Sequence, residues 1–177
     1  MPFELNEQDY SAWVVSPLLT PVSDVGSLAL VHLHDNNRGL EIVVEAPRKP
    51  QRPRWSLTFS VYPAYRNVPE ELRLALWRHL DATSQVSGHT FEVVNSPWLS
   101  AFRASEPLVD VHFPKLRHFV VTTEDDVIEV LSPEPPKVLE LGPAPADALP
   151  AGKSEVFYSP EDGTAQDILF RGGRSDA

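Results

Sequence analysis

Residues 54–61 read RWSLTFSV. Apolar and polar side chains alternate strictly through this stretch, the apolar ones being Trp55, Leu57, Phe59 and Val61. Because successive side chains of a β-strand point to opposite faces, the alternation predicts a strand with one buried face and one face in water. Half-buried strands are typical of antiparallel sheets, so this stretch indicates an antiparallel β component.

Two apolar stretches upstream predict a hairpin. Residues 27–34 (SLALVHLH) and 40–46 (LEIVVEA) flank residues 35–39 (DNNRG), whose Asn and Gly residues tolerate positive φ in a turn. The loop at 47–53, PRKPQRP, then leads to the strand at 54 and holds the most concentrated positive charge in the sequence.

Downstream, a helix is predicted over about 69–82. Pro69 suits the first helical position, and Glu70 and Glu71 suit the positive end of a helix. At helical spacing, the residues expected on one wide apolar face are Leu72, Leu74, Ala75, Leu76, Trp77, His79 and Leu80. Such a face is expected to pack against a sheet.

The remaining elements complete an α+β fold. HTFEVV (89–94) predicts a strand, and SPWLSAFRAS (96–105) predicts one or two helical turns opened by Ser96. LRHFVVTT (116–123) and VIEVLS (127–132) predict a last hairpin. We therefore expect one α+β domain over 1–131, an antiparallel sheet of about six strands packed on one main helix.

Proline divides the chain at about residue 132. The segment SPEPPKVLELGPAPADALPAG (132–152) contains six prolines, too many missing amide donors for a helix or a central strand. Residues 132–177 are therefore expected to be an extended or partly disordered Pro-rich tail. Its apolar clusters at 138–141, 156–158 and 168–170 are candidates for short arms that dock on the domain.

Composition narrows the class of function. The 177 residues include 25 acidic and 15 basic side chains, a net charge of −10, and no cysteine. The negative charge disfavours nucleic-acid backbones and anionic membranes, whereas it suits a basic protein partner. The absence of cysteine excludes disulfides and thiol catalysis. No secretory signal or long apolar run is recognisable, so we expect a cytoplasmic protein.

Two histidines form the only metal hypothesis. His32 and His34 lie two residues apart on a predicted strand and would point to the same side. The next acid, Glu41, lies beyond the turn and gives no known metal-binding spacing. Because Leu28 and Leu30 share the predicted face, the pair also fits the rim of a core. No metal or cofactor is assigned.

The acidic turn of the last hairpin is the main candidate site. Glu124, Asp125 and Asp126 are adjacent, with Glu129 a short distance along the second strand. The turn has no glycine and too few ligands for calcium. A structural turn and an exposed acidic knob that contacts a basic partner are both open.

Trp98 is the candidate aromatic anchor, either a core residue or an interface hot spot. His118, His79 and His112 are expected to be packing residues, because no nucleophile can be placed beside them. The known nucleophile, phosphate-loop, dinucleotide and zinc-protease motifs are absent from the sequence. We therefore expect a protein that is not an enzyme.

Four segments together resemble a known group of proteins. They are WSLTFSVYPAYR (55–66), LWRHL (76–80), SPWLSAFR (96–103) and LRHFVVTTEDDVIEVL (116–131). In this order they resemble small, mostly uncharacterised bacterial proteins, some of which are similar to immunity proteins encoded beside secreted polymorphic toxins. The resemblance covers about 54–131 and carries no catalytic residues.

The resemblance implies a non-catalytic protein that neutralises a basic toxin by occluding its active site. Two alternatives remain. One is a structural or scaffold subunit that uses its C-terminal arm, and the other is a β-rich domain that binds a small molecule or a metal.

Overall fold

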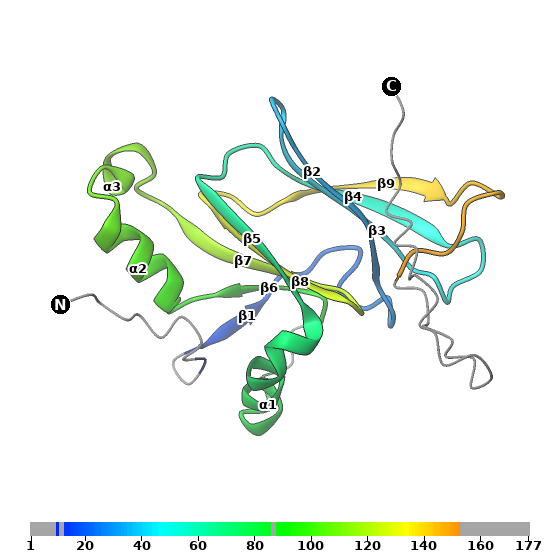
Figure 1. Cartoon of the computed structure of the whole chain (residues 1–177), viewed down its shortest axis with the longest axis horizontal. Helices are drawn as coiled ribbons and strands as arrows, with labels where there is room; N and C mark the ends of the chain where they lie inside the picture. The colour runs from blue at the N-terminus through cyan, green and yellow to red at the C-terminus, as the bar shows by residue number, and fades with distance from the viewer. Residues whose placement is uncertain (1–9, 11–12, 86–87, 153–177) are drawn as a thin grey trace, which may run out of the picture.

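The structure, a computed structural model, describes residues 10, 13–85 and 88–152. It is an α+β arrangement of two antiparallel sheets with few helices (Figure 1). One sheet has five strands in the order β1-β6-β7-β8-β5, and the other has four in the order β2-β3-β4-β9. The two sheets stack, and the helices lie on the far side of the five-stranded sheet (Figure 1).

The five-stranded sheet consists of β1 (Val15–Pro17), β5 (Ala64–Pro69), β6 (Thr90–Val93), β7 (Arg117–Thr122) and β8 (Asp126–Ser132). The four-stranded sheet consists of β2 (Ala29–Asn36), β3 (Gly39–Glu45), β4 (Pro53–Phe59) and β9 (Lys137–Pro143). The helical elements are the 3-10 turn η2 (Glu70–Arg73), α1 (Leu74–Ala82), α2 (Pro97–Ser105) and α3 (Val109–His112).

The main core lies between the two sheets. Its strand residues include Leu40, Ile42, Val44, Trp55, Leu57, Phe59, Phe119, Val121, Ile128 and Val130. The predicted strand at 54–61 is confirmed as β4, whose Trp55, Leu57 and Phe59 are buried. Val61 does not belong to it, because β4 ends at Phe59 and leaves Val61 47% exposed.

A second core lies between the helices and the outer face of the five-stranded sheet. Around α1 it contains Tyr10, Trp13, Leu76, Leu80, Phe91, Val93, Val120 and Val127. Around α2 and α3 it contains Leu99, Val109, Leu116 and Leu131. The predicted packing of the main helix on a sheet is thus confirmed.

The predicted apolar face of that helix was too wide. Leu72 is 67% exposed and Leu74 is 54% exposed, whereas Arg73 between them is buried. The cause is the 3-10 geometry of η2, because three residues per turn rotate the first side chains away from the 3.6-residue pattern.

Both predicted hairpins are confirmed. β2 pairs with β3 down to Asn36 and Gly39, so Asn37 and Arg38 form the turn. Gly39 has φ +130°, and a Cβ there would lie 2.3 Å from the carbonyl oxygen of Phe59, so the tight approach of β3 to β4 requires glycine. β7 and β8 form the last hairpin.

The described residues contain nine strands, more than the six expected. β1, β5 and β9 were not predicted, and neither was the division into two sheets. β9 lies in the Pro-rich segment and is extended, as expected there; it pairs with β4 at the edge of the four-stranded sheet. The clusters at 156–158 and 168–170 lie outside the described residues.

Residues 144–152 are attached to the same sheet. Arg52 donates hydrogen bonds to the carbonyl oxygens of Pro145 (3.1 Å) and Ala148 (2.7 Å), and Ala151 N–H donates to Glu45 (3.2 Å). Arg52 of the basic loop at 47–53 therefore makes intramolecular hydrogen bonds. Among the described helices, none has the length and apolarity needed to span a bilayer.

Candidate functional site

The acidic turn forms the tip of the β7–β8 hairpin. Thr123 closes it, because its hydroxyl accepts from Asp126 N–H at 3.0 Å and its own N–H donates to the Asp126 carbonyl at 2.8 Å. Glu124 is exposed, while Asp125 and Asp126 are half-buried. The residues expected at a turn are therefore at a turn, and their side chains reach the surface.

The tip is held against two neighbouring segments. Glu124 N–H donates to the Leu28 carbonyl at 2.8 Å, and the Glu124 carboxylate accepts from Ser27 at 2.5 Å and from Arg48 at 2.8 Å. The Asp125 carbonyl accepts from Glu70 N–H at 2.8 Å. These bonds fix the tip beside the start of β2 and the start of η2.

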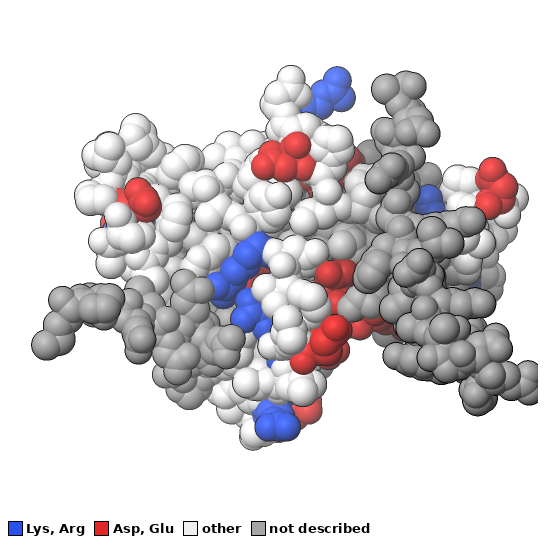
Figure 2. Space-filling view, in the orientation of Figure 1, with Lys and Arg blue, Asp and Glu red and all other residues white. Residues whose placement is uncertain are grey.

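An open groove of about 600 Å³ lies where these segments meet. It is lined by Ser23, Asp24, Gly26, Ser27, Glu70, Trp77, Gly88, His89, Thr122, Thr123 and Glu124. Its volume falls within the ~300–1,000 Å³ of typical ligand pockets. Figure 2 shows acidic side chains gathered where the hairpin tip meets the start of the helix.

The groove brings together carboxylates that are distant in sequence. Asp24 precedes β2, Glu70 begins η2, and Glu124 lies at the hairpin tip. Gly88 forms part of the wall with φ +62°, and a Cβ there would lie 2.6 Å from the Ser23 carbonyl oxygen. Close packing of two loops thus shapes the groove, and its carboxylates and hydroxyls suit a cationic or hydrogen-bonding ligand.

Trp77 is the aromatic residue of the groove, and sequence reasoning placed it only on the apolar face of the helix. Trp98, the predicted anchor, lies elsewhere. It is half-buried on the first turn of α2, with the Arg66 guanidinium 4.4 Å above its ring, and it packs on the cluster that includes Leu131 at the far end of β8. The structure does not bring Trp98 and the acidic tip together.

Glu129 also lies away from the tip and is completely buried, which excludes it from the exposed knob. It sits on the outer face of the five-stranded sheet, directly opposite Arg66 of β5. Its carboxylate accepts from Arg66 at 2.6 Å and from Arg73 at 2.7 Å. Arg73 also donates to the Tyr10 hydroxyl. Glu129 therefore serves as the anion of an internal ionic cluster.

His118 of β7 completes this ionic cluster. Its Nε2 lies 3.2 Å from the Glu129 carboxylate, out of line for an ideal hydrogen bond, and its Nδ1 lies 2.8 Å from Ser96 Oγ. Burial lowers the pKa of His118 below its ordinary value. Burial alone would raise the pKa of Glu129, but the neighbouring His118 and Arg66 outweigh it and lower that pKa.

The order Ser96, His118, Glu129 matches the roles of a nucleophile, a base and an orienting carboxylate. The surroundings do not support catalysis. Ser96 is 3% exposed, and its hydroxyl accepts from Leu99 N–H at 2.9 Å as the N-cap of α2. No substrate can approach a hydroxyl enclosed in this way, so the ionic cluster is structural.

His32 and His34 are exposed near the end of β2. Their predicted common face with Leu30 is wrong, because a β-bulge between Leu30 and His32 shifts the alternation and turns both histidines outward. His32 Nε2 lies 3.8 Å from the Glu41 carboxylate. Within the part of the chain that the structure describes, no three metal-binding side chains converge.

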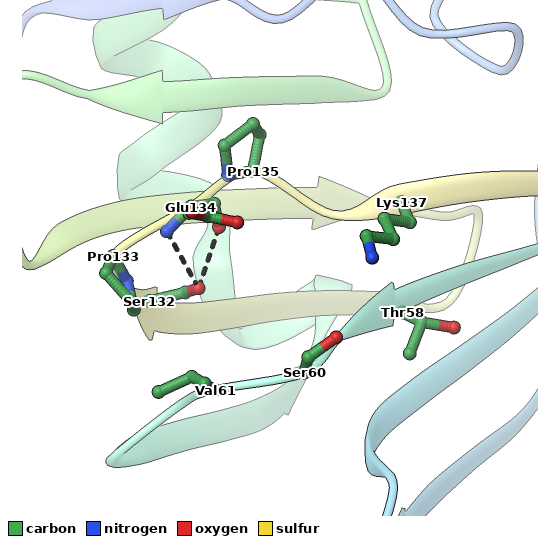
Figure 3. A pocket seen from close by; sticks show the side chains of 8 residues that line it. All are labelled: Thr58, Ser60, Val61, Ser132, Pro133, Glu134, Pro135 and Lys137. Atoms are coloured by element: carbon green, nitrogen blue, oxygen red, sulfur yellow. Dashed lines mark hydrogen bonds between the residues drawn. The ribbon is translucent and has the colours of Figure 1, made fainter.

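A smaller cavity of about 150 Å³ lies between the end of β4 and the β8–β9 connection (Figure 3). Its Ser132 hydroxyl is already bonded to the backbone of Glu134, as donor at 2.7 Å and acceptor at 3.2 Å. With that hydroxyl in use and a volume below that of typical ligand pockets, this cavity is a weaker candidate than the groove.

Comparison with known proteins adds no further assignment: no protein-family model, curated protein or solved structure matches the chain.

Proposed function

We propose that this chain is a non-catalytic, acidic protein-binding domain whose contact surface is the groove together with the β7–β8 tip. The observation that supports this most directly is the groove itself, where Asp24, Glu70 and Glu124 converge beside Trp77. Carboxylates pair with lysine and arginine, and an aromatic ring adds attraction for a cation. The net charge of −10 extends that attraction over a longer range.

The proposed partner is a basic protein. The resemblance to immunity proteins covers about 54–131, a range that contains both the tip and the helix that borders the groove. It favours a toxin domain that this chain neutralises by covering the active-site cleft. Electrostatic complementarity would then raise the association rate more than the lifetime of the complex.

The direct test is a binding and growth assay against a basic toxin domain encoded beside this gene. We expect co-expression to rescue growth, and we expect the association rate to fall steeply with added salt. If the purified chain neither binds nor neutralises such a domain, the immunity proposal is lost.

A charge-matched comparison tests the surface. The variant Glu124→Gln/Asp125→Asn/Asp126→Asn removes three charges at the tip, and we expect it to slow association by about tenfold or more. The control Glu106→Gln/Glu134→Gln/Glu140→Gln removes three charges at exposed positions outside the groove. Equal slowing by both variants would assign the effect to net charge and overturn the proposed location.

One observation favours a second candidate, the scaffold function. Leu139 is 65% exposed and Leu141 is 48% exposed on the edge strand β9. Because deleting the C-terminal segment would remove a strand of the sheet, the better test is Leu139→Ser/Leu141→Ser. Loss of self-assembly or of co-purifying subunits, with toxin binding unchanged, would support this function.

A further inference from the structure

Two separate segments, the one before β1 and helix α2, pack on the outer face of the five-stranded sheet, and His118 contacts both. Its ring lies edge-on to Trp13, at 5.4 Å and 82°, and edge-on to Trp98, at 5.1 Å and 83°. Trp13 belongs to the segment that precedes β1, and Trp98 belongs to α2. The His118 side chain is completely enclosed between them.

The contacts of the ring define one neutral tautomer. Ser96 Oγ already accepts from Leu99 N–H, so its own proton is available to His118 Nδ1. The hydrogen of a neutral ring then sits on Nε2, the nitrogen that faces the Glu129 carboxylate. The opposite tautomer would place a lone pair against that carboxylate and is disfavoured.

Protonation of His118 would disturb its packing against both Trp13 and α2. Nδ1 would become a donor, so the Ser96 hydroxyl that caps α2 would face two donors and its own proton would need a new acceptor. The described charged groups around the ring are Glu129 of β8, Arg66 of β5 and Arg73 of η2. Protonation would add a positive charge to a buried ring that already lies beside two arginines.

Among the described residues near Trp13, the titratable side chains of Tyr10 and His79 add no negative charge. The Tyr10 hydroxyl accepts from Arg73, and burial raises the pKa of Tyr10, so this side chain stays neutral. His79 belongs to α1, and its Nε2 lies 3.2 Å from the Trp13 carbonyl oxygen. It therefore contacts the same residue as His118 but lies away from the ionic cluster. His79 therefore provides a matched control.

We propose that His118 is an acid-sensitive latch: its protonation releases Tyr10, Trp13 and the start of α2 from the sheet, while the core between the two sheets stays folded. The latch does not depend on the proposed partner. It concerns the helix-covered face, and the sheet-to-sheet core has no part in it.

Hydrogen exchange between pH 6.5 and 5 is the test. If opening takes up one proton on His118, the opening equilibrium rises about tenfold per pH unit. After correction for intrinsic exchange rates, protection in residues 13–17 and in Pro97–Ser105 is expected to fall by that factor. Protection in β3 and β4 is expected to stay constant, because Glu129 is ionised across this window in both states.

Two variants identify the group. His118→Gln is expected to abolish the pH dependence of exchange protection both around Trp13 and in α2. His79→Gln is expected to retain that pH dependence. A slope that persists in His118→Gln, a wild-type slope of zero, or simultaneous loss of protection in β3 and β4 would each overturn the latch.

A second measurement does not require His118→Gln to fold. In the wild-type chain, the imidazole signals of His118 and the indole N–H signals of Trp13 and Trp98 can be titrated together by NMR. A shared midpoint below pH 6.5 is expected. Indole signals that move with a different midpoint, or do not move, would contradict the proposal.

Discussion

Glu45 and Glu129 are both completely buried glutamates, and each contacts two arginines, yet they join very different parts of the chain. The partners of Glu45 are Arg52 and Arg54, fewer than ten residues away. The partners of Glu129 come from β5 and η2, 63 and 56 residues away. One carboxylate organises a local loop, whereas the other connects distant elements across the sheet.

The comparison shows that burial alone does not define the role of a charge. Glu45 lies on the outer face of the four-stranded sheet and accepts a hydrogen bond from the backbone N–H of Ala151. Glu129 lies under the helices, beside His118, whose pKa burial lowers below its ordinary value. We expect the Glu45 cluster to affect local order and the Glu129 cluster to affect the whole fold.

The largest expected effect is from Glu129→Gln. It removes the counter-charge of two arginines, and the Arg73 side chain is only 6% exposed and cannot easily turn to water. Breaking one partner of a buried ion pair costs about 3–5 kcal/mol. Urea denaturation should show a loss of this size, and a loss below about 1 kcal/mol would mean that the arginines find other partners.

Acid should weaken the same cluster in the wild-type chain. The pKa of Glu129 is lowered from 4.5 to about 2 in the folded state, so the unfolded chain binds the proton more readily. The stability contributed by the Glu129 carboxylate is therefore full above pH 4.5 and is lost as pH falls toward 2, by at most about 3 kcal/mol. Denaturation midpoints at pH 6, 4 and 3 measure this loss. If the denaturation midpoint does not decrease as the pH falls below 4.5, the prediction is contradicted.

Glu45→Gln is expected to have a smaller effect, about 1–3 kcal/mol, because Arg52 and Arg54 are 19% and 17% exposed and can reach water. Its distinctive result should be faster hydrogen exchange in residues 144–152 with β7 and β8 unchanged. Glu41→Gln on the same strand, whose carboxylate is 38% exposed, is the matched control. Equal losses for Glu45→Gln and Glu129→Gln would remove the distinction between the two clusters.

The smallest effect is expected at the exposed pair. Arg48 is 78% exposed where it contacts Glu124, and exposed ion pairs contribute about 0–1 kcal/mol. Arg48→Ala should therefore leave the denaturation midpoint almost unchanged. A large loss would show that the hairpin tip is a stabilising contact as well as a surface.

Much of the fold can be predicted from the sequence, since the alternation of β4, the turn at Asn37 and Arg38, and the cap at Ser96 are local signals. The two buried glutamates cannot. In LEIVVEA and VIEVL each glutamate occupies a position that alternation assigns to water. Each glutamate is buried because segments distant in sequence pack over the outer face of its sheet. A local sequence pattern does not reveal such packing.

The groove could be predicted only in part. Glu124 was recognised through its neighbours Asp125 and Asp126, because three acids in a turn are conspicuous in sequence. Asp24, Glu70 and Trp77 belong to a loop, a helix start and a helix face, and only the tertiary fold brings them together. β5 is not predictable from alternation, because YRNVP lacks alternating apolar residues and its Arg66 points to the buried Glu129.

The pairing of β4 with β9 sets an order of events during synthesis. β2, β3 and β4 leave the ribosome as a continuous meander, but β9 begins 78 residues after β4 ends. At about 5–20 residues per second, the unpaired edge of β4 waits roughly 4–16 s for its partner strand. Throughout that interval it is open to pairing with another chain. Production of this protein should therefore be sensitive to chaperone supply and to translation speed between residues 60 and 136.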